Sequence, residues 1–316
     1  MANGESRTSK RRCILSSNSN SGTSGSSCAE PTAAHSTIPV VVAKLTETLV
    51  PPWSRVFPEY TTQWVGPVEF IASTPKHACD YIIALAQAGK TRHIHLSNAY
   101  TIALADQDSN YRDILANPAL NFPDGKPIGW VSAISRHSPR LRQVRGPQLF
   151  LDVLDQGRDH GIRHFLLGST HEVLKEMEAR LKARFPGIRI VGVNSPPFRR
   201  LTSSEILHQD ATILASGAQI VWVGLGTPKQ DLEAQRIADR LPIVAIAIGA
   251  AFDFAAGTLA IAPSWMRVAG LEWVHRFASE PRRLWRRYIF GNARFIKAVL
   301  FPAKRRRRDQ KKFPKR

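Results

Sequence analysis

The sequence has few cysteines and no long apolar run. Its three cysteines, Cys13, Cys28 and Cys79, have no near partner at the spacing of a metal site. We therefore expect neither a disulfide framework nor a zinc site, which suits a reducing compartment. The most apolar stretch, residues 243–252, is much shorter than the roughly 20 residues that a membrane span needs. No apolar segment follows Arg11-Arg12, so we expect no signal peptide and a cytosolic catalytic body.

Several catalytic and cofactor motifs are also missing. The chain has no G-x-G-x-x-G fingerprint, no G-x-x-x-x-G-K-[ST] phosphate loop, no G-x-S-x-G elbow and no H-E-x-x-H helix. Asp106-Gln107-Asp108 has the D-x-D spacing of metal-dependent sugar transferases, but we interpret it as a solvated helix face. His93 and His95 share one face of a strand without a third ligand, and we interpret them as structural. We therefore expect no metal and no cofactor.

The net charge of +19 is concentrated towards the C-terminal end of the chain. From Arg267 onwards there are 17 Lys/Arg and 3 Asp/Glu, whereas residues 1–266 contain 27 basic and 22 acidic residues. A segment this basic is expected to bind an anionic partner, either a lipid surface or a nucleic acid.

Composition divides the chain into four parts. Residues 1–50 are rich in Ser, Thr, Asn and Gly, which predicts disorder. Residues 51–261 are predicted to form an α/β catalytic domain, and residues 262–303 a helical, membrane-associating appendage. Residues 304–316 are predicted to be a disordered polybasic tail.

Short apolar runs alternate with longer amphipathic ones through the predicted catalytic domain. Strands are expected at residues 94–96, 163–167, 188–193, 219–223 and 243–248. Helices are expected after the first strand and at residues 173–181, 207–215 and 232–241. Strands this apolar are typical of a parallel sheet that is buried on both faces. The repeated units predict a doubly wound, Rossmann-like α/β fold, with ligands at the carboxyl ends of its strands.

Two of the loops that follow strands are candidates for phosphate binding. Gly168-Ser169-Thr170 opens a helix, where it either binds a phosphate or simply caps the helix. In residues 224–231 the glycines let a ligand approach the backbone, Lys229 adds a cation and Gln230 adds an amide. A tight turn with an exposed lysine explains this second loop equally well.

A third loop, residues 121–127, contains Asp124 between a proline and a glycine. Asp124 is either a general base that faces a cleft or part of a Pro-Asp-Gly turn. From turn chemistry alone, the second interpretation is favoured.

Residues 281–300 are predicted to form a basic amphipathic helix. Its apolar side comprises Leu284, Trp285, Tyr288, Phe295, Ile296 and Val299, and its cations lie mainly elsewhere. This pattern is typical of a helix at a membrane interface, and the run 304–308 adds further positive charge. A core helix with a solvated basic end and a nucleic-acid-binding segment are the alternatives. Trp265, Trp273 and Trp285 favour the membrane.

Motifs in a fixed order extend over some two-thirds of the chain. They are Ser97-Asn98-Ala99, Pro123-Asp124-Gly125, the runs 165–169, 224–230, 248–254, 262–266 and 270–273, Arg276, Glu280-Pro281 and Arg287-Tyr288. In their order and spacing the chain resembles the WecG/TagA/CpsF glycosyltransferases, also called glycosyltransferase family 26.

The resemblance implies a metal-independent, inverting transfer from a UDP-sugar to a polyprenyl-diphosphate-linked acceptor in cell-surface polysaccharide biosynthesis. It also implies a peripheral position on the inner face of the plasma membrane. No nucleic-acid partner is expected, and a homo-oligomer is left open. The sugar is also left open among N-acetylmannosamine, its uronic acid, glucuronic acid and glucose.

The resemblance assigns roles to particular residues and reverses the interpretation of the third loop. Asp124 matches the family's proposed catalytic base. The arginines of the appendage that match the family's catalytic arginines are Arg276, Arg283 and Arg286. The residues expected to bind substrate are Asn98, Gly125, Arg145, Gly168, Ser169, Gly224, Gly226, Lys229 and Gln230.

The chain departs from the family pattern at three places. Lys126-Pro127 follow Asp124-Gly125 where many members have x-Gly. Residues 143–148 lack the Arg and the Asp of the pattern Arg-Val-x-Gly-x-Asp, so Arg142 or Arg145 is expected to supply the guanidinium. Asp231 stands where a glutamate is usual. These departures bear on the identity of the donor more than on the reaction.

Two other functions fit parts of the sequence. A cytosolic, dehydrogenase-like nucleotide-binding protein fits the fold class, although the missing G-x-G-x-x-G argues against it. A nucleic-acid-binding module fits the basic tail, and salt-sensitive binding of DNA or RNA would distinguish it.

Overall fold

The computed structural model describes residues 61–136 and 138–301, apart from four side chains in the C-terminal helices. Those side chains belong to Arg267, Val268, Arg283 and Arg286. The predicted extension at residues 1–50 and the predicted polybasic tail at residues 304–316 lie outside the described residues.

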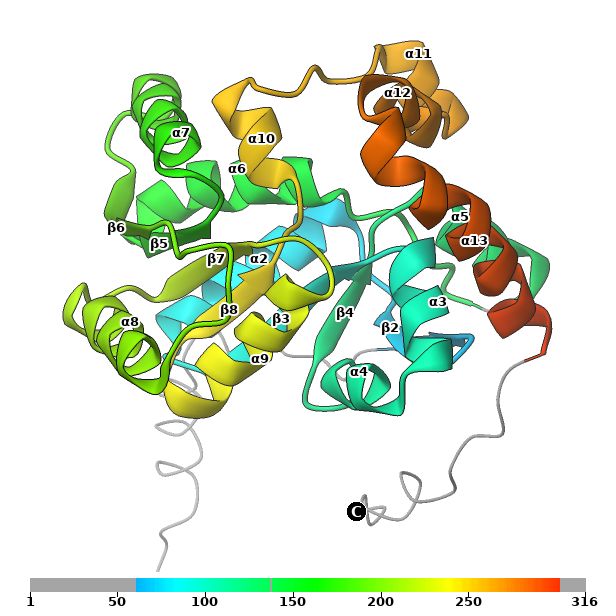
Figure 1. Cartoon of the computed structure of the whole chain (residues 1–316), viewed down its shortest axis with the longest axis horizontal. Coiled ribbons are helices and arrows are strands. Elements are labelled where there is room, and N and C mark those ends of the chain that lie inside the picture. Colours follow the sequence, from blue (N-terminus) through cyan, green and yellow to red (C-terminus); the bar gives the residue numbers. More distant parts are fainter. Residues whose placement is uncertain (1–60, 137, 302–316) are drawn as a thin grey trace, which may run out of the picture. The chain divides into compact units, whose positions relative to one another are not determined.

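A six-stranded sheet forms the centre of the described chain, in the order β4-β3-β8-β7-β5-β6 (Figure 1). Every neighbouring pair of its strands is parallel. The strands are β3 (Arg92–Ser97), β4 (Leu120–Pro123), β5 (Arg163–Gly168), β6 (Arg189–Asn194), β7 (Ile220–Gly224) and β8 (Val244–Ala247). Five of the six lie where the apolar runs predicted strands, which confirms the parallel α/β fold.

The sixth strand, β4, was expected to be a loop. It is the edge strand of the sheet, and Pro123 at its end is tolerated there because an edge strand has fewer ladder hydrogen bonds to lose. Asn121 is buried within it because its amide donates to the carbonyls of Glu69, at 3.0 Å, and of Leu115, at 2.8 Å. β4 ends directly before Asp124.

Helices cover both faces of this sheet (Figure 1). Leu166, Trp222 and Ile246 share one core with α2 (Pro75–Gln87), α6 (Gly146–Gln156), α7 (His171–Arg184) and α10 (Ala251–Ala256). The next residue towards the N-terminus in each strand, Phe165, Val221 or Ala245, faces α8 (Ser203–Ala215) and α9 (Lys229–Arg240). This alternation with period two is what a sheet buried on both sides requires. A short 3-10 helix, Gly157–His160, joins α6 to β5.

A third core joins the first described strands to the last helix. The strands β1 (Thr62–Val65) and β2 (Val68–Ile71) form an antiparallel hairpin. The hairpin shares buried side chains with α3 (Ala99–Gln107), α4 (Ser109–Ile114), α5 (Lys126–Ile134) and α13 (Pro281–Leu300). Two short helices, α11 (Ser264–Ala269) and α12 (Glu272–Ser279), precede α13. Within residues 61–136 and 138–301, no helix combines the length and the apolar character that crossing a bilayer requires.

The helix α13 has two apolar stripes rather than the single apolar side expected from the sequence. One stripe, which contains Leu284, Phe295 and Ala298, is buried. The other is exposed and contains Trp285, Ile289, Ile296 and Leu300. The buried stripe attaches the helix to the third core, so only the second is available to a partner.

Candidate active site

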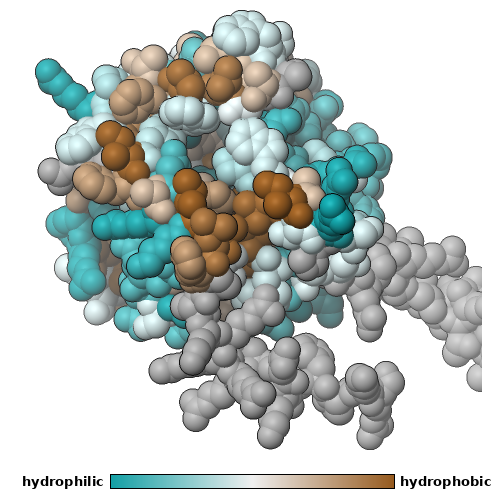
Figure 2. Space-filling view, turned by 90° about the vertical axis from the view of Figure 1, so that its right-hand side faces the viewer, coloured by the Kyte–Doolittle hydropathy of each residue, from teal (hydrophilic) through white to brown (hydrophobic). Residues whose placement is uncertain are grey.

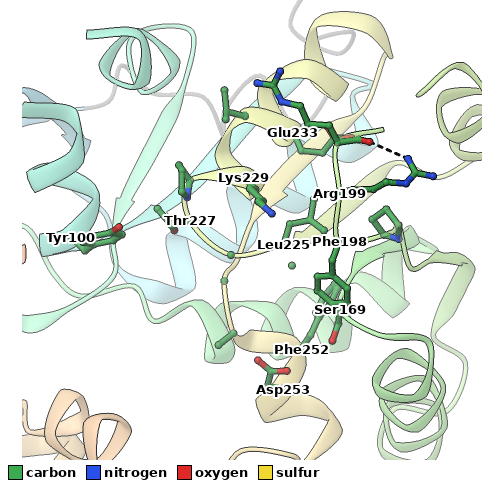
Figure 3. A pocket seen from close by; sticks show the side chains of 18 of the residues that line it. Tyr100, Ser169, Phe198, Arg199, Leu225, Thr227, Lys229, Glu233, Phe252 and Asp253 are labelled. Atoms are coloured by element: carbon green, nitrogen blue, oxygen red, sulfur yellow. Dashed lines mark hydrogen bonds between the residues drawn. The ribbon is translucent and has the colours of Figure 1, made fainter. Parts of the chain in front are cut away.

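The loops that matter for function lie together at one edge of the sheet. Because all six strands are parallel, the loops that follow them open at the same edge. A cleft of about 2000 Å³ lies there. Its walls come from the loops after β5, β6, β7 and β8, from α9 and α10, and from α13. Figure 3 shows Lys229, Phe198 and Asp253 around this cleft, with Tyr100 of α3 on another side.

The loop after β5 is built by close packing and by an ordinary helix cap. A Cβ atom on Gly168 would lie 2.6 Å from the carbonyl oxygen of Gly224, so no larger residue fits without a backbone shift. Thr170 is the N-cap of α7, and its hydroxyl accepts a hydrogen bond from the N–H of Val173 at 3.4 Å. Ser169 and Thr170 line the cleft. The side-chain cap favours the capping interpretation for this loop, because one N–H of the helix start is already satisfied.

The loop after β7 is better suited to an anion. A Cβ on Gly224 would meet the ring of Phe252 at 2.6 Å, whereas one on Gly226 would meet nothing within 4 Å. The helix α9 begins at Lys229 without a side-chain cap, and both Gly226 and Lys229 line the cleft. An uncapped helix start beside a lysine attracts negative charge. Of the two loops predicted to bind phosphate, this one is therefore the better candidate.

The buried side chain of Gln230 contacts the loop after β7. Its Oε1 accepts the N–H of Gly226 at 3.1 Å, and its Nε2 lies 3.4 Å from Thr227 Oγ1. The amide that was expected to bind substrate therefore holds the loop in place. Asn98 has a similar position at the start of α3, where its Oδ1 accepts the N–H groups of Tyr100 and Thr101.

Asp124 lies at the carboxyl end of β4, next to the end of β3. Its N–H donates to the carbonyl of Ser97 at 2.7 Å, and its Oδ1 accepts the N–H of Gly146 at 3.3 Å. Gly125 follows with a φ of 138°, a conformation that disfavours other residues. The carboxylate is partly buried, although Asp124 is not one of the residues that line the large cleft.

The environment of Asp124 raises the pKa of its carboxyl group towards neutral pH. Burial raises its pKa to about 6, while the N–H of Gly146 and the charge of Arg276 oppose the rise. Glu272 raises this pKa further, and Arg145 lowers it. A carboxylate with a pKa close to the working pH is suited to general base catalysis.

Two charged residues of α12 approach Asp124 from the predicted appendage. Glu272 forms a two-pronged ion pair with Arg145, in which Arg145 Nε lies 3.1 Å from Glu272 Oε2 and Arg145 Nη2 contacts Oε1. The guanidinium of Arg276 lies 5.7 Å from the ring centre of Phe254. Its buried Nε has no hydrogen-bond partner in the described part of the chain. The structure thus brings Arg145 and Arg276 together near the predicted base.

The sequence did not single out Arg287 as a site residue. Arg283 and Arg286, which were expected in the site, lie on α13, but their side chains are outside the description. Arg287 of the same helix lines the cleft, stacks on Tyr100 at 4.5 Å and interacts electrostatically with Asp124. Burial lowers its pKa. Two signals were available in the sequence. Arg287-Tyr288 is one of the motifs that the chain shares with the family, and Arg287 falls three residues after Leu284 and eight before Phe295, on the buried stripe of α13.

The histidines of β3 are structural, as interpreted from the sequence. His93 Nδ1 contacts His95 Nε2 at 2.9 Å, and His95 Nδ1 contacts Asp231 Oδ1 at 2.9 Å. The hydroxyl of Tyr111 donates to the other oxygen of Asp231 at 2.9 Å. This buried chain ties β3, α4 and α9 together. Asp231, one of the departures from the family pattern, therefore acts in the core beneath the cleft.

The second aspartate of Asp106-Gln107-Asp108 has a structural contact at a helix start. Asp108 caps α4 by accepting the N–H groups of Asn110 and Tyr111. Among the described residues, no group of three His, Cys, Asp or Glu side chains is arranged to hold a metal ion. Gln148 stands where the family pattern Arg-Val-x-Gly-x-Asp has its aspartate. It donates to Asp152 at 2.7 Å and lines a second cavity of about 350 Å³ together with Arg145.

A comparison with protein families identifies this arrangement. The model of the Glycosyl transferase WecG/TagA/CpsF family matches residues 64–310, which include the sheet, the cleft and the C-terminal helices. The parallel α/β fold and this match define a glycosyltransferase of cell-surface polymer synthesis. The chain belongs to the WecG/TagA/CpsF family.

Proposed function

We propose that the protein is an inverting, metal-independent transferase that moves a sugar from a UDP-sugar onto a polyprenyl-diphosphate-linked acceptor. The observation that carries this proposal is the position of Asp124. Its partly buried carboxylate has a pKa of about 6, is surrounded by arginines and lies at the sheet edge where the cleft opens. Family membership supports a nucleotide-sugar donor and a lipid-linked acceptor in general terms.

The proposed reaction is a single displacement. Asp124 takes the proton of the acceptor hydroxyl, whose oxygen forms a bond to the anomeric carbon of the donor. The bond from that carbon to the diphosphate breaks on the opposite side, and UDP leaves with the bonding electrons. Attack from the face opposite the leaving group inverts the anomeric configuration.

The charge that develops on the leaving UDP needs fixed positive groups. Lys229 and the uncapped start of α9 supply positive charge at the cleft, and Arg276 lies on the side of Asp124. Arg283 and Arg286 are proposed to add to these cations from α13. Preorganised charges of this kind stabilise a transition state without reorganising during the reaction.

We also propose that α13 and its neighbours dock on the inner face of the plasma membrane. The exposed stripe of α13 continues onto Phe290 and Phe301, and Trp265 and Trp273 are exposed on α11 and α12. Figure 2 shows apolar side chains gathered on the side of the molecule that carries α13. An exposed apolar surface with adjacent cations fits the interface of an anionic bilayer. Docking there would place the cleft beside a lipid-linked acceptor.

The reaction is tested by release of UDP from a panel of UDP-sugars, with and without a polyprenyl-diphosphate acceptor in anionic vesicles. We expect turnover that depends on the acceptor and persists in EDTA. Asp124→Asn should lower kcat by about 100-fold or more, whereas Asp113→Asn, on the exposed side of α4, should not. Full activity of Asp124→Asn would exclude Asp124 as the base.

Membrane docking is tested by co-sedimentation with anionic vesicles. Ile296→Asp places a charge on the exposed stripe and should weaken vesicle binding by about tenfold or more. Asn292→Asp, one turn away and also exposed, is the matched control for added negative charge. If both variants lost binding equally, apolar insertion by α13 would be excluded and only charge attraction would remain.

A further inference from the structure

The buried stripe of α13 contains a charged residue. Leu284, Arg287, Gly291, Phe295 and Ala298 follow one another at spacings of three and four, so they share one face of the helix. Leu284, Phe295 and Ala298 are buried in apolar surroundings. A cation on such a face loses hydration, and it is retained only where something offsets the cost.

The position of Arg287 is set by Tyr100. The guanidinium lies 4.5 Å from the centre of the Tyr100 ring, which is within the range of a cation–π contact. One turn further along α13, a Cβ on Gly291 would lie only 3.2 Å from Tyr100 Cδ2. Glycine in a helix interior costs about 1 kcal/mol relative to alanine. Glycine at position 291 allows α13 to pack closely on the Tyr100 ring. This packing sets the position of Arg287 relative to that ring.

The stack directs Arg287 to the cleft without supplying a counter-ion. Both Tyr100 and Arg287 line the cleft, as do Gly226 and Lys229 of the loop after β7. No hydrogen bond or ion pair joins the Arg287 guanidinium to any side chain that the structure describes. The negative charge that acts on it is that of Asp124, the proposed base. A partly buried arginine that lines a cleft without a hydrogen bond or ion pair to a described side chain is suited to binding an anionic ligand.

We propose that Arg287, held by Tyr100, binds the β-phosphate of the nucleoside diphosphate donor. This rests on the proposed function, because Asp124 marks the reacting carbon. The phosphate attached to that carbon is the β-phosphate, so a cation that lines the cleft and also interacts electrostatically with Asp124 is placed to bind this phosphate. Arg287 is then a catalytic residue that also carries the charge of departing UDP, and Tyr100 is its positioning residue.

The proposal is tested by calorimetric titration of the full-length protein with UDP and with UMP. Arg287→Met keeps much of the side-chain length and removes the charge. It should weaken UDP binding by about 10- to 100-fold and leave UMP binding within about twofold, because only UDP has a β-phosphate. Retained UMP binding also shows that the variant is folded. Lys297→Ala removes an exposed cation of the same helix that does not line the cleft, and should change neither constant.

The positioning role of Tyr100 has its own readout. Tyr100→Phe keeps the ring face and should keep the ratio of UDP to UMP affinity, whereas Tyr100→Leu should reduce this ratio as Arg287→Met does. Equal UDP affinity in the wild type and in Arg287→Met would overturn the role of Arg287 and leave the proposed function standing. A wild-type protein that bound no UDP would contradict the proposed donor as well.

Discussion

Arg145 and Glu272 join the start of α6 to the start of α12 through two parallel contacts between guanidinium and carboxylate. Both residues act on the carboxyl group of Asp124, with opposite signs. The Arg145 guanidinium, which was expected to bind substrate, is therefore paired with a carboxylate of the C-terminal helices. Because Glu272 belongs to α12, the position of this helix affects the pKa of Asp124, the proposed base.

Glu272→Gln should therefore change the pH dependence of the reaction. The substitution removes a charge that raises the pKa of Asp124 and leaves Arg145, which lowers it, without its counter-ion. The pKa of Asp124 should fall, so the acidic limb of the kcat/KM profile should move to lower pH. Glu176→Gln breaks a comparable ion pair with Arg180 on α7 and is the control. An unchanged acidic limb in Glu272→Gln would contradict the coupling.

Asp124→Asn should stabilise the protein at neutral pH while it removes activity. The pKa of Asp124 rises from 3.8 to about 6 on folding, so the folded state favours the protonated form. The associated stability is present below pH 3.8 and is lost as the pH rises through 6. A neutral amide avoids that loss, so the free energy of unfolding at pH 7.5 should rise by up to about 3 kcal/mol. Urea denaturation at pH 7.5 and at pH 4 measures this, and an equal gain at both values would contradict the linkage.

The buried chain from His95 to Tyr111 should contribute strongly to stability. Asp231→Ala would leave the His95 ring and the Tyr111 hydroxyl without their partner in the core, and should lower the free energy of unfolding by about 3–5 kcal/mol. Tyr111→Phe removes one hydrogen bond and should cost about 1–3 kcal/mol. Chemical denaturation measures the free energy of unfolding of both variants, and the loss should be larger in Asp231→Ala. A larger loss in Tyr111→Phe would refute this account.

Gly168→Ala should destabilise the protein mainly by steric overlap. Its new Cβ would lie 2.6 Å from the carbonyl oxygen of Gly224, in a backbone that cannot move without disturbing β7. A loss of about 2–4 kcal/mol is expected. Gly187→Ala is the matched control, because Gly187 also has a positive φ but no atom within 4 Å of a new Cβ. Thermal melts measure the loss of stability in both variants. Equal losses would mean that backbone conformation alone, and not the contact with Gly224, causes the effect.

Most of the sheet could be predicted because its strands are buried on both faces. β5, β7 and β8 are nearly continuous apolar runs. Short runs of this kind are typical of strands in a parallel sheet that is buried on both faces. β4 could not be predicted in this way. Its Asn121 is tolerated only because the carbonyls of Glu69 and Leu115 accept its hydrogen bonds, and no local pattern reveals such distant partners.

The candidate site was predictable in its position more than in its details. The glycine turns follow predicted strands, so a parallel sheet places them at one edge. Asp124 follows β4, which was not predicted, and its place in the site came from the family resemblance. The sequence did not distinguish the start of α7 from that of α9, because the difference lies in the Thr170 cap. The roles assigned to the thirteen site residues remain predictions, and the Asp124→Asn variant addresses the role of the proposed base among them.

The order of apolar runs and loops by itself determined the α/β fold and placed the glycine loops after β5 and β7 at the ligand edge of the sheet. The tertiary structure showed that Asp124 also lies at this edge, because β4 ends directly before it. The tertiary structure alone decided how acidic that carboxyl group is, because burial and charges from α6 and α12 set its pKa. It also placed the Arg287 guanidinium of α13 against the Tyr100 ring at the cleft. This placement depends on the buried stripe of α13 and on the close approach of Gly291 to Tyr100, which are contacts between residues far apart in the chain.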